Sequence, residues 1–349
     1  MAGRFVKAAF VSAPGTVELK SVPRPDIEEG AVMVHMKACG ICGSDLETVV
    51  GTNIQSSKLG HEVCGIVSES RDTTVREGDY VIPHNRVGCG ICELCKSGNA
   101  TTCPVFRQSN FEPCGFSEEF KLPAHNLKGG GIHFPSRGVS YEDASFVEPL
   151  GCCIRGLNQA VGSGGVKAAN FKRVLVIGAG PIGLLHMELL NHYFPEIEIV
   201  ACDIVPSRLE IAEKLEHARG IIPRGSLVSE AMKQSHSAGF DLVIVATGNL
   251  GVFSDAVQCV RKSGALLLFG LPHQGAFYNL DLASMFLNEL KIIPSYSSTD
   301  VEMGAALQLL EQRKINVKKF ITAVFPLSKV GEAFAAARSQ NQMKVLVSN

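Results

Sequence analysis

Four cysteines lie close together in the sequence, at a spacing that lets them surround one metal ion. Cys89, Cys92, Cys95 and Cys103 follow the pattern C-x2-C-x2-C-x7-C, with glycines nearby that allow a tight wrap. Four thiolates in a tetrahedron are typical of structural Zn²⁺, which stabilises a segment with little core of its own. An iron–sulfur cluster also takes four cysteines. Because the sequence offers no electron-transfer partner, the loop predicts structural zinc.

A second candidate metal site is drawn from distant parts of the chain. Its potential ligands are a thiol, an imidazole and two carboxylates, from Cys42, His61, Glu62 and Glu148. Catalytic zinc takes about three protein ligands and keeps one position open for a substrate oxygen. An alcohol bound there loses its proton more easily, and its carbon then gives a hydride to a nicotinamide. The set is therefore a hypothesis for zinc-dependent alcohol oxidation.

Other interpretations of these residues remain open. Cys39 and Cys42 form a C-x-x-C motif, which is a redox pair in some proteins. Such a pair is expected beside a βαβ unit, whereas this motif lies in a β-rich part of the chain. Cys152 and Cys153 are further potential ligands, but they follow the last candidate ligand on the same stretch, and we expect them to pack within a helix. His61 alone is also compatible with an ordinary loop histidine.

A glycine-rich turn is the next chemical feature. The apolar run 174–177 leads directly into Gly178-Ala179-Gly180-Pro181-Ile182-Gly183, a G-x-G-x-x-G motif that opens a helical stretch. The first glycine permits the turn, the second lets a pyrophosphate approach the backbone, and the third lets helix and strand pack closely. Free N–H groups at the helix start favour the phosphates. In this context the motif predicts a dinucleotide site.

The choice of dinucleotide depends on Asp203, which ends the next apolar run 25 residues after Gly178. An acidic residue here accepts hydrogen bonds from the adenosine ribose and repels a 2′-phosphate. The following residue, Ile204, supplies no charge to hold that phosphate. We therefore predict NAD in preference to NADP. Arg208 could reach the same place, although it is equally compatible with a solvated helix face.

Composition limits the class of protein. The chain has 349 residues, of which 46% are hydrophobic and 19% charged, with a net charge of -1. These values indicate a globular protein of two domains and give no electrostatic signature of nucleic-acid or membrane binding. We expect neither a membrane span nor a signal peptide, and hence a cytoplasmic protein. Twelve cysteines then suggest metal ligands and free thiols instead of disulfides.

The elements that must position these residues change character along the chain. Residues 1–150 contain short β-type runs punctuated by glycine and proline. From about 171 to 293, buried apolar runs at 174–177, 197–201, 242–246 and 265–269 alternate with helical stretches. Such alternation predicts a parallel sheet with helices on both faces. After Pro294 the pattern is mixed, with a helix near 301–312 and a strand near 344–347. We expect one domain of residues 1–150 with 294–349 and another of 151–293.

Nearly the whole chain resembles the zinc-containing medium-chain dehydrogenase/reductase family, most closely its polyol (sorbitol-type) and threonine dehydrogenase subgroup. The resemblance is carried by the segments 40–45 (GICGSD), 60–65 (GHEVCG) and 146–150 (FVEPL), the four-cysteine loop and the glycine loop. It implies an α/β protein in which a GroES-like, β-rich catalytic domain with two zinc sites accompanies a doubly wound Rossmann domain for NAD. It also implies a homodimer or homotetramer that acts on a small-molecule alcohol.

The resemblance also assigns roles to single residues. Cys42 and His61 would ligate the catalytic zinc, and Glu62 would be a ligand in some states or a close neighbour. Glu148 stands where alcohol dehydrogenases have a third, cysteine ligand. Ser44 would pass the alcohol proton outward, and Asp45 would orient the zinc ligands. In the nucleotide domain, Thr247 and Phe269 occupy positions that line the cofactor site of the family.

One departure concerns the proton relay. Many family members have a histidine five residues after the first cysteine ligand, whereas this chain has Glu47, a carboxylate that either relays the proton or is a surface charge. We predict oxidation of a secondary alcohol of a polyol, sugar or cyclitol to a ketone. The alternatives are an L-threonine 3-dehydrogenase or amino-cyclitol dehydrogenase, and a protein that binds zinc and nucleotide without turnover.

Overall fold

The computed structural model describes residues 4–51, 58–162, 171–214, 218–271, 275–339 and 341–349. The chain forms two compact units, one of Met1–Gly151 with Ser297–Asn349 and the other of Cys152–Tyr296. The first boundary falls inside helix α5 (Val147–Ala160). The sequence placed the domain boundaries at 150/151 and 293/294, near these two positions.

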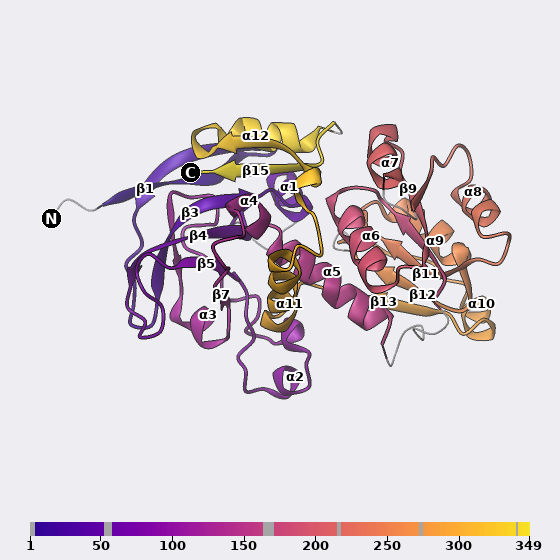
Figure 1. The fold of residues 1–349 in the computed structure, drawn as a ribbon, viewed down its shortest axis with the longest axis horizontal. Helices are drawn as coiled ribbons and strands as arrows, with labels where there is room; N and C mark the ends of the chain where they lie inside the picture. Colours follow the sequence, from indigo (N-terminus) through magenta and orange to yellow (C-terminus); the bar gives the residue numbers. More distant parts are fainter. Residues whose placement is uncertain (1–3, 52–57, 163–170, 215–217, 272–274, 340) are drawn as a thin grey trace. The chain divides into compact units, whose positions relative to one another are not determined.

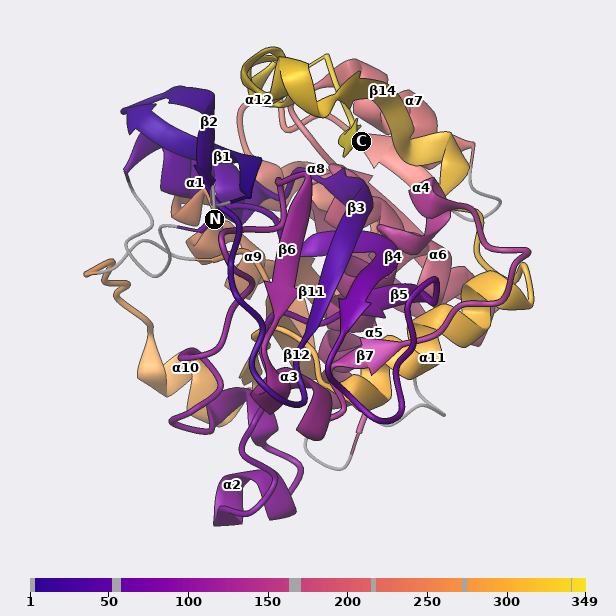
Figure 2. The same ribbon diagram turned by 90° about the vertical axis from the view of Figure 1, so that its left-hand side faces the viewer.

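A mixed sheet forms the framework of the first unit. Its strands are β3 (Val32–Gly40), β4 (Glu62–Ser70), β5 (Tyr80–Pro83), β6 (Glu119–Leu122), β7 (Ile132–His133), β14 (Ile321–Pro326) and β15 (Lys344–Ser348). They are ordered β14-β15-β3-β4-β5-β7, with β6 also paired to β3 (Figures 1 and 2). Strand β15 runs antiparallel to β3, with Leu346 opposite Gly40. The segment that follows the second unit in sequence therefore returns to the sheet of the first.

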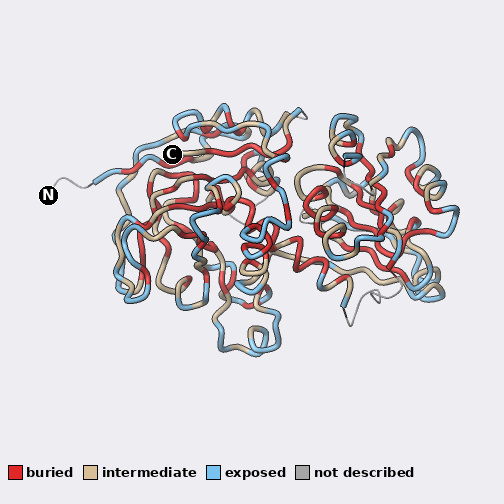
Figure 3. The backbone as a smooth tube through the Cα atoms, in the orientation of Figure 1, coloured by how far each residue is buried: buried red, intermediate tan, exposed pale blue. Residues whose placement is uncertain are grey.

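The core of the first unit lies around β3, which is buried along most of its length (Figure 3). Phenylalanines pack against this strand and its neighbours in two pairs: Phe111 lies against Phe120 with ring centroids 4.7 Å apart, and Phe116 lies edge-on to Phe334 at 5.3 Å. Buried aromatic rings of this size dominate the apolar area that a core removes from water. These packed rings therefore hold in place the sheet that carries the candidate metal ligands.

Smaller elements complete the first unit. A hairpin of β1 (Phe5–Ala13) and β2 (Thr16–Pro23) forms a separate two-stranded sheet. The helices are α1 (Gly43–Val50), α2 (Glu93–Lys96), α3 (Ala124–Lys128), α4 (Tyr141–Ala144), α11 (Asp300–Glu311) and α12 (Val330–Arg338). Helix α1 follows β3 almost directly, so it carries the residues between 43 and 50 at the end of the central strand.

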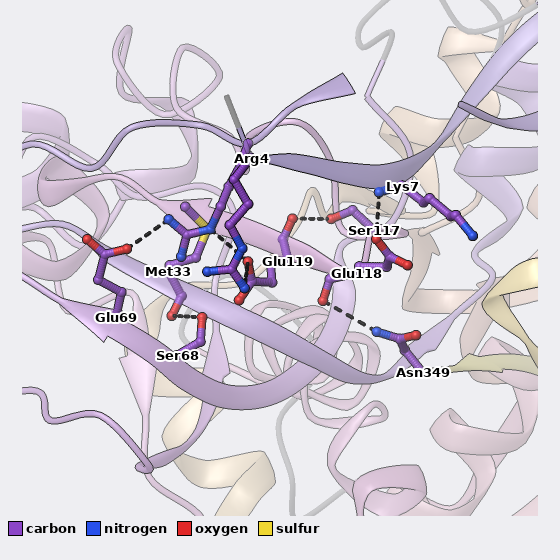
Figure 4. Close-up of polar contacts among 10 residues, drawn as sticks. Arg4, Lys7, Met33, Ser68, Glu69, Ser117, Glu118, Glu119 and Asn349 are labelled. Carbon is purple, nitrogen blue, oxygen red and sulfur yellow. Dashed lines mark hydrogen bonds and ion pairs between the residues drawn. The ribbon is translucent and has the colours of Figure 1, made fainter. Parts of the chain in front are cut away.

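An ion-pair network connects this hairpin to the large sheet, and Figure 4 shows Arg4, Glu69 and Glu119 of this network. Arg24, just after β2, is its centre. Its Nε donates to Glu119 at 2.7 Å and its Nη1 to Glu69 at 2.8 Å, while Arg4 lies 3.5 Å from Glu119. Burial raises the pKa of the Glu119 carboxyl, but hydrogen bonds from Arg24 and Ser68 and the charges of both arginines outweigh it and lower the pKa. Ionised Glu119 therefore stabilises the fold at neutral pH.

The second unit is a parallel sheet in the order β10-β9-β8-β11-β12-β13. Its strands are β8 (Arg173–Ile177), β9 (Glu198–Cys202), β10 (Ala218–Ile221), β11 (Phe240–Val245), β12 (Val260–Leu268) and β13 (Lys291–Pro294). Its helices, besides most of α5, are α6 (Pro181–Tyr193), α7 (Pro206–Glu213), α8 (Leu227–Gln234), α9 (Phe253–Cys259) and α10 (Leu282–Leu287). The strand order reverses between β8 and β11, which is where such sheets bind ligands.

The predicted fold class is confirmed. A β-rich unit accompanies a doubly wound parallel sheet, and the second unit has the βαβ alternation expected from the apolar runs. No helix in the described part of the chain is long and apolar enough to cross a membrane.

Replacing Arg24 with methionine is expected to lower the free energy of unfolding at pH 7 by about 2–3 kcal/mol, because the buried Glu119 carboxylate loses its main partner. The loss should shrink towards pH 3, since protonated Glu119 no longer needs the cation and the stabilisation disappears as the pH falls through its depressed pKa. Urea denaturation at both pH values measures this. Lys233→Met, which breaks the exposed pair with Glu230, is the control and should cost about 0.5 kcal/mol or less. An equal loss at both pH values would contradict the assignment.

Candidate metal centres and nucleotide loop

Three candidate ligands from distant positions meet at one end of the large sheet. The ligand atoms of Cys42, His61 and Glu62 all lie within 4.8 Å of one another. Cys42 is the N-cap of α1, immediately beyond the end of β3, and Glu62 opens β4. Because Gly40 pairs with Glu62 in the antiparallel ladder, the strand pairing itself brings the thiol to the imidazole and carboxylate.

Asp45 holds the two sides of this group together. Its buried carboxylate accepts hydrogen bonds from the backbone N–H of Cys42 and of Gly60, both at 3.0 Å, and lies 3.6 Å from Nδ1 of His61. Burial lowers the pKa of His61, but the charges of Asp45 and Cys42 and their hydrogen bonds raise it well above its usual value. A carboxylate at Nδ1 favours Nε2 as the metal-binding nitrogen, which is the orienting role expected for Asp45.

Glu62 has a second, unexpected partner in Lys344, the first residue of β15. The Lys344 Nζ pairs with Oε2 of Glu62 and donates to the carbonyl oxygen of Ile41 at 3.2 Å. Both side chains are almost fully buried, and the ammonium lies 5.8 Å from the centre of the Phe146 ring. Sequence reasoning missed Lys344; a lone lysine opening the apolar run Val345–Val347 was the available signal.

Gly40 provides the space for this pair. A Cβ on Gly40 would overlap Oε2 of Glu62 and lie 2.8 Å from Cε of Lys344. The backbone of Gly40 is ordinary β-strand, so the position needs glycine for its lack of a side chain and not for its conformation.

The residues present fit a metal ion. Oε1 of Glu62 is buried and has no hydrogen-bond partner among the described residues, and the Glu62 carboxylate lies in a group with a thiol and an imidazole. A buried carboxylate oxygen without a partner is costly, and a cation would satisfy it. One sulfur, one nitrogen and one oxygen donor are a set that suits zinc.

The other predicted residues of this site lie outside the group of three. Glu148 is buried in the first turn of α5, and its carboxylate is not among the ligand atoms that cluster. Ser44 and Glu47 are both half-buried on α1, three residues apart and hence on one side of the helix. Their roles remain predictions.

The four-cysteine loop forms a compact thiol cluster. Sγ of Cys92 lies 3.6 Å from that of Cys95 and 3.7 Å from that of Cys103, and Cys89 lies 4.0 Å from Cys95. Sulfurs bound to one zinc at about 2.3 Å are separated by roughly 3.8 Å in a tetrahedron. Backbone N–H groups of Ile91 and Cys92 lower the pKa of Cys89 to about 6, which favours the thiolate. The loop is therefore shaped for a tetrahedral metal ion.

The glycine loop connects β8 to α6 in the second unit. Gly178 has φ +99°, which requires glycine, and a Cβ on it would lie 3.0 Å from the carbonyl oxygen of Ala246. A Cβ on Gly183 would overlap the carbonyl oxygen of Gly178. Gly180 is the N-cap of α6, and Pro181 follows as its first residue. The helix N-terminus is thus placed as a phosphate-binding turn requires.

Asp203, just after β9, is tied to this loop. Its Oδ2 accepts from the N–H of Ala179 at 2.8 Å and its Oδ1 from Val205 at 2.9 Å. Arg208 lies 3.9 Å from the carboxylate and also faces Gly180, where a Cβ would lie 4.0 Å from its Nη1. The carboxylate therefore braces the glycine loop, and each oxygen retains a lone pair for a ribose hydroxyl.

The remaining predicted cofactor residues lie at the same edge of the second sheet. Thr247 follows β11 and accepts the N–H of Asn249 at 3.2 Å, and Phe269 follows β12 with its ring edge-on to His186 at 4.7 Å. Ile182 lies in the first turn of α6, where its carbonyl faces Sγ of Cys153 at 3.9 Å. Because these residues all follow the carboxyl ends of parallel strands, they surround the site where such sheets bind nucleotides.

Two family models match the chain. The alcohol dehydrogenase GroES-like domain matches residues 28–129, and the glucose dehydrogenase C-terminus matches residues 142–348. The second match alone spans more than half of the chain, and the two together include every residue assigned above to the metal centres and the nucleotide loop.

Individual proteins agree with these matches. D-arabinitol dehydrogenase 1 of Uromyces fabae is 27% identical, over 97% of this chain and 96% of that protein. L-threonine 3-dehydrogenase of Caldanaerobacter subterraneus subsp. tengcongensis is 31% identical, over 71% of each chain. The solved structure of a zinc-binding dehydrogenase from Sinorhizobium meliloti 1021, bound to NADP, has a TM-score of 0.84 at 22% identity and covers 99% of this chain and 100% of its own.

Gly40→Ala is expected to lower the free energy of unfolding by about 1–3 kcal/mol, since the new methyl group displaces the buried Glu62–Lys344 pair. Gly43→Ala is the matched control, because a Cβ there meets nothing within 4 Å and alanine favours the helix that begins at this residue. Chemical denaturation of both variants makes the comparison. Equal stability of the two would show that the space at Gly40 is not required.

Proposed function

The chain belongs to the zinc-containing medium-chain dehydrogenase/reductase family, in its polyol and threonine dehydrogenase subgroup, and we propose that it oxidises a secondary alcohol of a polyol, sugar or cyclitol to a ketone with NAD as hydride acceptor. The observation that carries the proposal is the group of Cys42, His61 and Glu62, in which Glu62 is buried and its Oε1 has no hydrogen-bond partner among the described residues. This arrangement supports a catalytic metal ion with a position left for substrate.

Zinc at this group would supply a Lewis acid that lowers the pKa of an alcohol bound to it. Cys42 and His61 are the proposed constant ligands, with Glu62 and Glu148 as the carboxylates available to complete the shell. Asp45 keeps His61 in the orientation that presents one nitrogen to the metal. A second zinc is proposed at the four-cysteine loop, where it stabilises the fold and takes no part in the reaction.

The proton released from the alcohol needs a path to solvent. Ser44 and Glu47 are proposed as this path because they lie on one side of α1, one turn apart, beside Cys42. A carboxylate ligand in place of a second thiolate leaves the metal less electron-rich and offers an acceptor to a neighbouring hydroxyl. This chemistry favours a vicinal diol over a simple apolar alcohol.

NAD is proposed as the cofactor on the evidence of Asp203. Its carboxylate lies beside the glycine loop, where it would repel a 2′-phosphate and accept the ribose hydroxyls. Arg208 is the competing influence, since a guanidinium at this place can hold a phosphate. The ion pair with Asp203 offsets its charge, which supports NAD.

L-threonine is the second candidate substrate. The relative that is 31% identical is an L-threonine 3-dehydrogenase, and threonine carries a secondary alcohol like that of a polyol. An amino-cyclitol is the related alternative. We propose a cytoplasmic location because the four thiols of the cysteine loop and the thiol of Cys42 are kept reduced in such a compartment.

We also propose that the protein is a homo-oligomer whose copies meet through the face around α10. Four apolar side chains are strongly exposed there, namely Phe277 (94%), Phe286 (82%), Leu287 (77%) and Leu282 (71%). The hydroxyl of the neighbouring Tyr278 accepts the N–H of Ser254 at 3.0 Å, so the segment that carries Phe277 is anchored. The patch continues into β13, the edge strand of the sheet, which a second copy can extend.

The catalytic proposal predicts NADH formation at 340 nm by the zinc-loaded protein with at least one polyol or cyclitol. The panel includes L-threonine and simple secondary alcohols, each with NAD and with NADP. We expect a vicinal diol to be the best substrate and kcat/KM to be at least about tenfold higher with NAD. Glu148→Ala should reduce turnover, and Cys42→Ser should abolish it.

Three results would count against this proposal or a part of it. Full turnover by Glu148→Ala on the best polyol would remove that residue from the site, and a preference for L-threonine would select the second candidate. If NAD binds but no NADH forms with any compound of the panel, a non-catalytic zinc- and nucleotide-binding protein would be favoured.

The oligomer proposal predicts that Phe286→Asp shifts the native mass towards the 37.3 kDa of one chain, since a charge on the buried face of an interface is costly. Light scattering coupled to size-exclusion chromatography measures the mass. Val301→Asp is the control: Val301 is also 71% exposed but lies in the first unit. An unchanged mass for Phe286→Asp, or an equal shift for both variants, would reject this face.

A further inference from the structure

We propose that Lys344 is a positioning residue for the metal centre: by holding one oxygen of Glu62, it keeps this carboxylate a weak ligand that substrate can displace. The inference rests on the proposed function only in that Cys42, His61 and Glu62 bind a metal ion. It assigns a role to a residue that neither the ligand pattern nor the glycine loop includes.

The two oxygens of Glu62 have different surroundings. Oε2 pairs with Nζ of Lys344, whereas Oε1 has no hydrogen-bond partner among the described residues, and the carboxylate as a whole belongs to the group with Cys42 and His61. The side chains of Lys344 and Glu62 are 4% and 1% exposed, so water does not screen the pair. With a metal ion at the thiol and imidazole, the one carboxylate would be shared between two cations.

Lys344 is fixed from several sides. Its strand β15 is paired with β3 at Leu346 and Gly40, its Nζ also donates to the carbonyl of Ile41, and its ammonium faces the Phe146 ring. Gly40 leaves the space that the Glu62–Lys344 pair fills. Lys344 therefore cannot move with Glu62 towards the metal. The Glu62 carboxylate must then divide its charge between the ammonium and the metal ion.

This division determines how strongly Glu62 binds the metal. An ammonium on one oxygen withdraws charge from the other, and partners of a ligand tune its strength and orientation. Without the lysine, the buried carboxylate would have no paired side-chain cation among the described residues and would bind the metal as a full ligand. The position that a substrate oxygen needs would then be occupied. Lys344 thus keeps a metal position exchangeable without itself touching substrate.

The test uses the full-length protein with Co²⁺ in place of zinc, because its visible spectrum reports ligand number and type. Four proteins are compared with wild type: Lys344→Met, Lys344→Arg, Glu62→Gln and the double variant Lys344→Met/Glu62→Gln. Lys121→Met is the control, since it removes a partly buried lysine paired with Glu28 and Glu112 in the same unit, away from the metal group. Release of the Co²⁺ bound at this centre to a chelator is timed for each.

We expect Lys344→Met to change the Co²⁺ spectrum and to slow metal release by about tenfold, which is the size of effect that partners of metal ligands have, although with the opposite sign to a partner that strengthens its ligand. Lys344→Arg, which keeps the charge, should resemble wild type, as should Lys121→Met. In the Glu62→Gln background the lysine substitution should have no effect, because the carboxylate through which it acts is absent.

Faster release from Lys344→Met, an unchanged spectrum, or the same change in the Glu62→Gln background would overturn the role of Lys344. If Lys344→Met does not fold, the test uses Lys344→Arg and Lys344→Gln instead. Lys344→Arg should then release Co²⁺ like wild type, and Lys344→Gln should release it more slowly. If neither result is obtained, the role of Lys344 is overturned. Failure of the proposed function is recognised separately, because wild type would then bind no Co²⁺ at this centre or would turn over no alcohol.

Discussion

The candidate metal centre depends on the antiparallel pairing of β3 with β4 on one side and with β15 on the other. The first pairing sets Gly40 opposite Glu62, and the second sets it opposite Leu346. Within two residues of these paired positions lie Cys42, His61 and Lys344. The backbone hydrogen bonds of the strands therefore determine where these side chains meet. Buried charge makes the arrangement specific, because only this register pairs Glu62 with Lys344 and brings Asp45 to the backbone of Gly60 and to His61.

Much of this could be predicted from local sequence. The glycine loop and the four-cysteine loop are each contiguous, so the spacing of Gly178 to Gly183 or of Cys89 to Cys103 already contains the geometry. The parallel sheet was predictable where apolar runs are long, as at β8 and β11. The short strand β10 (ARGI) has one aliphatic residue beyond its alanine and carries no such signal; it forms because β9 offers it an edge.

The spread-out site was harder to predict because its residues are joined only by tertiary pairing. The types of Cys42, His61, Glu62 and Glu148 suggested a metal, but nothing local says which carboxylate is near the thiol, and the structure groups Glu62 with it and leaves Glu148 outside the cluster. Lys344 was missed for the same reason, since a charged residue that opens an apolar strand is usually at the surface. Its burial follows from the space that Gly40 leaves on the neighbouring strand, more than three hundred residues earlier in the chain.

The return of β15 to the first sheet has a consequence for how the protein is made. Residues 40–62 leave the ribosome long before residue 344, with the whole second unit synthesised in between. At typical elongation rates this interval is roughly 15–55 s. During that time the end of β3 at residues 38–40 lacks its partner β15, Glu62 lacks its lysine, and the thiol of Cys42 belongs to an unfinished centre. Newly made protein in the cell would then need either a chaperone to cover the open strand or early metal capture to protect the thiol from oxidation.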